Sequence, residues 1–122
     1  MIRITLRGVP PSLNQFAGRT NSWEYRKAKS DWTERVIYSV RALRDRPREP
    51  YQLADVELLY YFPTRSRHDA DNYAGKLLLD GLTRAGVIVD DDMSHIRLHI
   101  AGSYDKGQPR TVITVMEVAT DD

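Results

Sequence analysis

Two groups of aspartates lie on either side of one apolar segment in the middle of the 122-residue chain. Asp69 and Asp71 precede the segment, and Asp90, Asp91 and Asp92 follow it. Carboxylates held a few ångströms apart resist joint ionisation unless a cation lies between them. Oxygen ligands without any cysteine favour Mg²⁺ or Mn²⁺. Such ions lower the pKa of bound water and stabilise charge on a phosphate oxygen, so the aspartates indicate phosphate-ester chemistry.

Each acidic group also has a purely structural interpretation. Asp71 is a suitable N-cap for a following helix, and 90–92 is typical of a solvated turn. Asp80 lies four residues after Lys76, the spacing of a surface ion pair on a helix. Together these interpretations do not explain why acidic groups flank one apolar helix on both sides, which favours the metal site.

The basic residues point to a polyanionic partner. Without the five flanking aspartates, the chain has 12 acidic and 18 basic residues, a balance of +6. The arginines cluster at Arg41, Arg44, Arg46 and Arg48, and again at Arg65 and Arg67. An acidic centre within a basic protein is what a metal-dependent enzyme acting on nucleic acid needs. A solvated helix face is the alternative reading of the arginines.

Composition places the chain among globular proteins, with 41% hydrophobic and 29% charged residues. Its length predicts a single domain, 1–122. No apolar run approaches the roughly 20 residues that span a bilayer, and the alternating start lacks the apolar block of a signal peptide. We therefore expect a cytoplasmic protein without a membrane partner, which the absence of cysteine also fits.

Hydrophobic periodicity predicts the elements that position the aspartates. Alternation predicts strands at 2–8, 53–62, 96–100 and 112–118, the last two forming a hairpin, with a short strand at 87–89. A helix from about 23 to 44 is expected, capped at Asn21 with Glu24. Its apolar stripe consists of Ala28, Trp32, Val36, Val40 and Leu43.

A second helix is expected at 72–85, ended by Gly86. Asp69 and Asp71 lie where an extended segment meets this helix, and side chains two apart in an extended chain project to the same side. Because 90–92 follows the same helix, the helix can bring the two acidic groups together. The order β-α-β-α-β-β predicts an α+β domain with two helices packed on one mixed sheet.

Several short motifs resemble the signature of the RusA family of crossover junction endodeoxyribonucleases, or Holliday junction resolvases, often carried by phages and prophages. The matching residues are Asp69-Ala70-Asp71-Asn72, Lys76, Asp80-Gly81-Leu82, Ala85-Gly86-Val87 and Asp90-Asp91. In addition, Pro10-Pro11-Ser12-Leu13-Asn14 is similar to the family's PPSxN motif after its first strand. The resemblance covers most of the chain.

This resemblance implies a RusA-like homodimer that uses Mg²⁺, with Mn²⁺ as a substitute, to place paired symmetric nicks in four-way junction DNA. The setting it implies is DNA recombination and repair in a bacterial or phage-infected cell. Asp69, Asp71 and Asp91 match the catalytic, metal-binding acids, and Lys76 matches the catalytic lysine. Lys76 follows Asp71 by five residues where the family pattern has four, and Gly75 marks the extra residue.

The third acid is ambiguous by one position because three aspartates stand in a row at 90–92. Asp91 is preferred because three apolar residues after Gly86 then lead into the acidic pair. The residues expected to contact DNA are Asn14, Arg65, Arg67, His68 and Asn72. Two other functions stay open: a non-catalytic DNA-binding dimer, and a metal-dependent nuclease with less selectivity for DNA structure.

Overall fold

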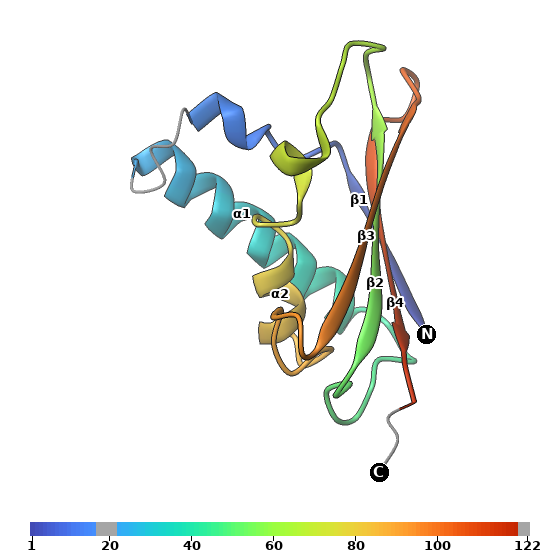
Figure 1. Cartoon of the computed structure of the whole chain (residues 1–122). Coiled ribbons are helices and arrows are strands. Elements are labelled where there is room, and N and C mark those ends of the chain that lie inside the picture. Colours follow the sequence, from blue (N-terminus) through green and yellow to red (C-terminus); the bar gives the residue numbers. More distant parts are fainter. Residues whose placement is uncertain (17–21, 120–122) are drawn as a thin grey trace.

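The structure is a computed structural model that describes residues 1–16 and 22–119. Its elements are β1 (Ile2–Arg7), the 3₁₀ helix η1 (Leu13–Phe16), α1 (Trp23–Arg41), β2 (Ala54–Phe62), the 3₁₀ helix η2 (Ala70–Tyr73), α2 (Leu79–Arg84), β3 (Ile96–Tyr104) and β4 (Arg110–Glu117). Figure 1 shows both α-helices on one side of the sheet. The predicted α+β domain with the order β-α-β-α-β-β is therefore confirmed.

The sheet has four strands in the order β1-β4-β2-β3. β4 pairs antiparallel with both β1 and β2, whereas β3 pairs parallel with β2. The sheet is therefore mixed, as predicted. The parallel pair requires a crossover connection, and residues 63–95, which include η2 and α2, form it on the helix-covered side (Figure 1).

The first helix follows its predicted apolar stripe. Trp32, Val36 and Val40 are buried against the sheet, and the helix ends at Arg41, three residues before the expected end. Ser22 is the N-cap, and its hydroxyl accepts a hydrogen bond from the Tyr25 amide at 3.2 Å. The predicted cap Asn21 lies outside the described residues. Within the described chain, no helix combines the length and the apolar character needed to cross a membrane.

The second predicted helix, 72–85, is interrupted. Residues 70–73 form a 3₁₀ turn, and the α-helix begins only at Leu79 and has six residues. Gly75 lies between them with φ +91°, a left-handed conformation that ends any continuous helix. A Cβ on Gly75 would lie 2.8 Å from Leu58 Cδ1, so the chain also passes too close to the sheet for a side chain there. Gly86, with φ +80°, ends α2 as predicted.

The predicted hairpin between the last two strands is wrong, because β2 lies between β3 and β4. A strand with apolar residues on both faces is favoured in the middle of a sheet. β4 has that character, with Val112 partly buried and Ile113 and Val115 buried, whereas most of β3 is exposed. The predicted strand 87–89 is reduced to a single bridge between Tyr51 and Ile88.

Candidate functional site

The segment between β2 and α2 carries most of the predicted site and is anchored to β2. The His68 ring stacks on the Phe62 ring with centroids 3.6 Å apart and planes inclined by 8°. The Tyr60 hydroxyl donates a hydrogen bond to the Tyr73 carbonyl at 2.6 Å. Burial, and secondarily the neighbouring Tyr73, raises the pKa of Tyr60, so this hydroxyl keeps its proton. These two contacts hold η2 against the end of the sheet.

Asp69 is the residue before η2 and has an extended backbone, yet its side chain makes no capping hydrogen bond. Its carboxylate instead accepts a hydrogen bond from Arg67 Nε at 2.9 Å, with the Asp69 side chain 50% exposed. Asp69 also borders a depression whose other walls include Phe62, His68 and residues 100–102 of β3. The carboxylate is therefore accessible, and it lies beside the outermost strand of the sheet.

Asp71 lies within the 3₁₀ turn and is exposed. Among the described residues its carboxylate has no hydrogen bond or ion pair, so the N-cap interpretation does not account for it. The extended segment that was expected to carry both aspartates ends at Asp69, because residues 70–73 form a 3₁₀ turn.

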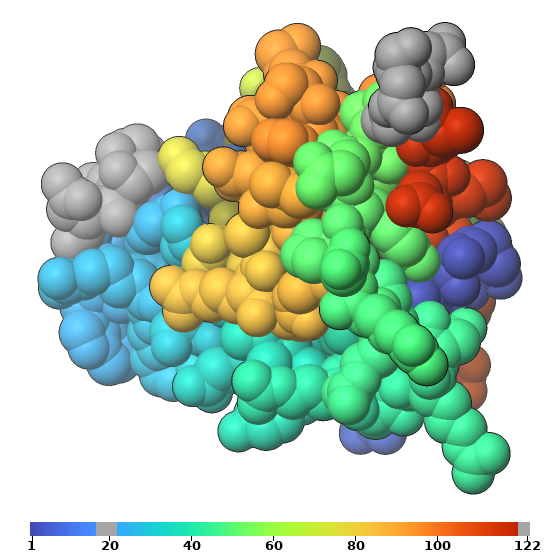
Figure 2. Space-filling view, turned by 90° about the horizontal axis from the view of Figure 1, so that it is seen from below, coloured from blue at the N-terminus to red at the C-terminus, as the bar shows by residue number. Residues whose placement is uncertain are grey.

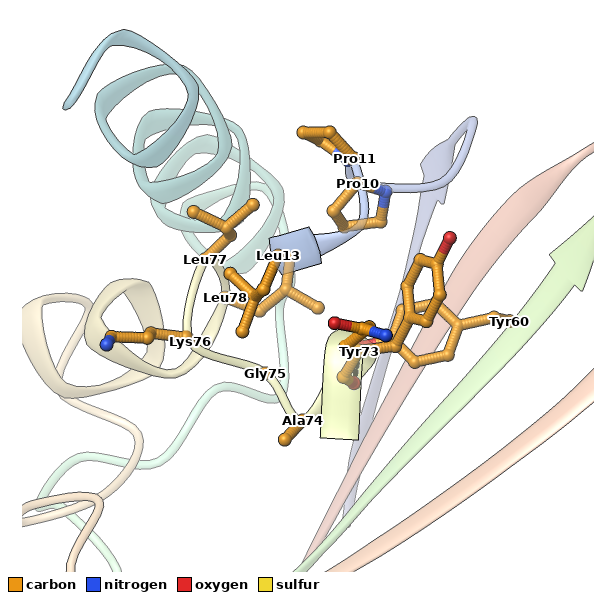
Figure 3. Close-up of a pocket in the computed structure, with 11 residues that line it drawn as sticks. Pro10, Pro11, Leu13, Tyr60, Tyr73, Ala74, Gly75, Lys76, Leu77 and Leu78 are labelled. Atoms are coloured by element: carbon orange, nitrogen blue, oxygen red, sulfur yellow. Dashed lines mark hydrogen bonds between the residues drawn. The ribbon is translucent and has the colours of Figure 1, made fainter. Parts of the chain in front are cut away.

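The two motifs that resemble the family signature lie side by side. Pro10, Pro11 and Leu13 line one wall of a small pocket, and residues 72–78 line another (Figure 3). The 3₁₀ helices η1 and η2 are also in contact. Asn14 is exposed on η1, with its amide bonded to the Ser12 hydroxyl at 3.2 Å. The fold thus places the early motif next to the aspartate motif, although they are far apart in the sequence.

Lys76 is exposed, and its side chain points away from Tyr60 and Tyr73 (Figure 3). Its ammonium nitrogen lies 5.9 Å from the centre of the Tyr25 ring. The predicted ion pair with Asp80 is absent among the described residues, since Asp80 pairs with Arg84 at 3.1 Å instead. Lys76 therefore has no carboxylate partner in the part of the chain that the structure describes.

Four of the five residues predicted to contact DNA lie on the segment between β2 and α2, whereas Asn14 lies on η1. Arg65, Arg67 and Asn72 lie with His68 between β2 and α2. The Arg65 guanidinium lies 4.1 Å from the centre of the Tyr104 ring, at the end of β3. Arg67 is thus paired with Asp69, and Arg65 lies against the last residue of β3.

The second acidic group lies at the opposite end of the sheet. The carbonyl of His95 accepts a hydrogen bond from the Ala54 amide at 2.9 Å, which places 90–95 beside the start of β2. Figure 2, seen from that end, shows the orange residues after α2 next to the green residues that lead into β2. β2 has nine residues, and a rise of about 3.3 Å from each residue to the next separates its first and last residues by roughly 26 Å.

Two members of this second group stabilise its turn. Asp90 Oδ1 accepts from the Asp91 amide at 2.8 Å, and Asp92 Oδ1 accepts from the Ser94 amide at 3.0 Å. Burial raises the pKa of the Asp91 carboxyl, and the charges of Asp90 and Asp80 raise it further. The turn interpretation accounts for Asp90 and Asp92, while Asp91 is exposed and has acidic neighbours.

The expectation that α2 brings the two acidic groups together is not met within one chain. In residues 1–16 and 22–119, no three histidine or acidic side chains are close enough to hold one metal ion. The physical reason is the short α2 together with the parallel pairing of β2 and β3, which places the groups at opposite ends of β3. One copy of the chain therefore does not fit a three-carboxylate Mg²⁺ site.

No protein-family model matches the chain, and no curated protein matches it.

The sequence did not predict two contacts of the site, the stacking of His68 on Phe62 and the hydrogen bond from Tyr60 to Tyr73. Alternation did place Tyr60 and Phe62 on the inner face of their strand, which is the face that the following loop covers. The partners of these rings could not be read from the sequence, because loop paths are not periodic.

Proposed function

We propose that this chain is a metal-dependent endodeoxyribonuclease that resolves four-way DNA junctions by paired nicks, in DNA recombination and repair. The observation that carries the proposal is the meeting of the two signature motifs around η2, where Arg67 pairs with Asp69 and Asp71 has no partner among the described residues. The resemblance to the RusA signature supports the junction as the substrate. Mg²⁺, with Mn²⁺ as a substitute, is the cofactor that these carboxylates favour.

The residues around η2 have distinct expected roles. Arg65, Arg67 and His68 would contact the DNA backbone, and Asn14 and Asn72 would contact it from the two adjoining 3₁₀ helices. Lys76 would stabilise negative charge that builds up on the phosphate, because its ammonium has no carboxylate partner among the described residues. Phosphate contacts position the protein without reading the base sequence.

A divalent cation would supply an activated water and neutralise charge on the phosphate. Asp69 and Asp71 are the carboxylates at η2 available to hold it, whereas Asp91, the third ligand expected from the sequence, lies at the other end of β3 in the same chain. A four-way junction has two-fold symmetry, and its resolution needs two opposed cuts. A dimer with two-fold symmetry presents two equal sites for this purpose.

The experiment is a cleavage assay on a labelled four-way junction and on linear duplex of the same sequence, with Mg²⁺ and with EDTA. Symmetric nicks confined to the junction and dependent on Mg²⁺ are expected. Cutting of both substrates would instead indicate a general nuclease. Asp71→Asn should abolish cleavage and spare junction binding, whereas Asp45→Asn, an exposed aspartate in the loop after α1, should behave as wild type. Undiminished cleavage by Asp71→Asn would overturn the assignment.

A non-catalytic DNA-binding dimer is the second candidate function. The separation of the acidic groups at opposite ends of β3 favours it. In that case the protein should bind the junction equally well in Mg²⁺ and in EDTA and should cut no substrate. The cleavage assay therefore decides between the two candidates.

A further inference from the structure

A groove lies between the two α-helices, apart from the pocket that the two signature motifs share. It has a volume of about 390 Å³, which is within the range of sites that hold small ligands. The helices that form it are in close contact, because a Cβ on Gly81 would come within 2.6 Å of Val36 Cβ. Figure 2 shows the gold residues of α2 beside the blue-to-teal residues of α1. The lining side chains include Arg26, Lys29, Ser30 and Thr33 of α1 and Asp80 and Arg84 of α2.

Two cations of this groove are not neutralised. Asp80 pairs with Arg84 at 3.1 Å, so the charges of that pair cancel. Arg26 and Lys29 form no ion pair with any residue that the structure describes. Side chains three apart are neighbours on the surface of a helix, and like charges there repel. An anion bound between Arg26 and Lys29 would remove this repulsion.

The other carboxylate of the groove is too far along the helix to take that place. Glu34 follows Lys29 by five residues, which is a rise of about 7.5 Å along α1. The groove therefore has a cationic end at Arg26 and Lys29. Its other end is mixed in charge, with Glu34 beside the neutralised pair of α2.

Lys76 lies near the cationic end of the groove. Its ammonium nitrogen is 5.9 Å from the centre of the Tyr25 ring, and Tyr25 precedes Lys29 by about one turn of α1. The Lys76 side chain points away from the sheet (Figure 3). Lys76, Arg26 and Lys29 therefore line one path that leads from the segment after η2 to the groove.

We propose that the cationic end of this groove binds a phosphate of the DNA strand that passes the aspartates at η2. Arg26 and Lys29 would hold the phosphate, and the Ser30 hydroxyl, which has no hydrogen bond among the described residues, would donate a further one. The identity of this strand rests on the proposed function, whereas the binding of a phosphate by these side chains does not.

The chemistry of the walls favours a phosphodiester over an acidic segment of another protein. A guanidinium donates two parallel hydrogen bonds to a phosphate. A docked peptide also needs apolar pockets for its anchoring side chains. Ile37 is the one large apolar side chain among the described residues that line the groove. The groove thus offers charge without the apolar surface that a peptide requires.

The groove sets where the strand runs relative to the cut. The rise from Tyr25, beside Lys76, to Lys29 is about 6 Å along α1. One strand of a duplex carries a phosphate about every 3.4 Å of its axis. The phosphate in the groove is therefore about two nucleotides from the phosphate at Lys76. Such a contact would position the strand without reading its bases.

The site is tested by junction binding in EDTA while the salt rises from about 50 mM to about 200 mM. Each neutralised phosphate adds about 0.9 to the slope of log affinity against log salt. Arg26→Gln/Lys29→Gln should lower the steepness of this slope by about that amount and should unfold at the wild-type temperature, because neither side chain has an ion pair to lose among the described residues.

The matched control removes the same charge outside the groove. Lys27→Gln/Arg48→Gln changes a lysine that is paired with Asp31 on another face of α1, at 3.0 Å, and an exposed arginine in the loop after this helix. The control should keep the wild-type slope. A wild-type slope in the groove variant, or an equal fall in both double variants, would overturn the site.

Directed cleavage of the DNA locates the strand. The chain has no cysteine, so an iron chelate attached to Ser30→Cys generates radicals only beside the groove. It should cut one strand of each bound arm, about two nucleotides from the position that Lys76 contacts. Asp31→Cys, about 100° around α1 from position 30, is the control and should give much weaker cuts. Equal cutting from both positions, or none from Ser30→Cys, would overturn the strand path.

The cleavage assay separates this site from the proposed function. A wild-type protein whose binding depends on the groove but which cuts nothing would overturn the proposed function alone. A wild-type protein that cuts the junction, together with a groove variant that keeps the wild-type slope, would overturn the groove alone. A wild-type protein that binds no junction DNA would overturn both.

Discussion

The His68 imidazole lies flat against the Phe62 ring, with 3.6 Å between the ring centres. Phe62 is the buried last residue of β2, and His68 immediately precedes Asp69. The stacking therefore fixes the position of the acidic residue relative to the sheet. Tyr73, the last residue of η2, belongs to the same aromatic cluster, with its ring centre 5.0 Å from that of Phe62.

His68→Ala should loosen this anchor. Aromatic pairs contribute about 1 kcal/mol beyond the area they bury, so the free energy of unfolding should fall by about that amount. The Asn72 amide, which bonds to the Asp69 carbonyl at 3.0 Å, should exchange its hydrogen faster. His68→Phe keeps a flat ring and should restore slow exchange. Equal exchange rates in His68→Ala and wild type would show that the stack does not hold the loop.

Thr33→Val should stabilise the protein. The Thr33 hydroxyl oxygen is buried and has no hydrogen-bond partner in the described part of the chain. Valine has nearly the same shape without the unsatisfied hydroxyl, so a gain of about 1 kcal/mol is expected in chemical denaturation. Thr111→Val is the matched control, because the Thr111 hydroxyl donates to the Gly8 carbonyl at 2.9 Å. The control should lose stability, and a loss in both variants would contradict the prediction.

Gly81→Ala should destabilise the contact between the two helices. A Cβ at Gly81 would lie 2.6 Å from Val36 Cβ and 3.0 Å from the Thr33 carbonyl oxygen. Overpacking costs about 1–3 kcal/mol, which exceeds the roughly 1 kcal/mol that alanine adds in a helix. Thermal unfolding should show a lower midpoint. Gly107→Ala, whose Cβ would have an ordinary 3.6 Å contact with Asp105, should leave the midpoint nearly unchanged.

Asp105 should make stability depend on pH at the turn between β3 and β4. The Arg110 guanidinium, at 2.8 Å, and the Gln108 amide hold the pKa of the Asp105 carboxyl below its ordinary value. Because the folded pKa is lower than the unfolded value of about 3.9, the contribution is present above that value. It is lost as the pH falls through the folded pKa.

Asp105→Asn should therefore melt at a lower temperature than wild type at pH 7, and the two melting temperatures should converge at pH 2–3. Asp31→Asn is the control, since Asp31 forms an exposed pair with Lys27 on α1 at 3.0 Å and such pairs contribute little. A difference between Asp105→Asn and wild type that stays constant down to low pH would contradict the assigned role of the carboxylate.

The sequence by itself determined the elements whose signal is local. Alternation marks β1 and β2, and the apolar stripe through Trp32, Val36 and Val40 marks α1, because a strand or an amphipathic helix with one buried face repeats with a fixed period. Gly86 ends α2 for an equally local reason, its left-handed backbone. These features need no knowledge of what packs against them.

Tertiary structure decided the interruption of the second helix and the partner of each strand. The pattern at 72–85 is helical, yet Gly75 adopts a left-handed backbone where the chain passes close to Leu58, and this interrupts the helix. β3 and β4 are neighbours in sequence, but β2 lies between them because the more apolar β4 occupies the middle of the sheet. Such competition between distant segments leaves no periodic trace in the sequence.

In the candidate site, too, the sequence predicts the chemistry of the side chains, whereas their positions depend on the tertiary structure. Residue types and spacing identify Asp69, Asp71 and Asp91 as potential oxygen ligands, because a carboxylate has that chemistry wherever it lies. Their positions depend on the order of the strands, which places the first two at one end of β3 and the third at the other. Distance between side chains is a property of the folded sheet, so only the tertiary structure could show that one chain keeps these carboxylates apart.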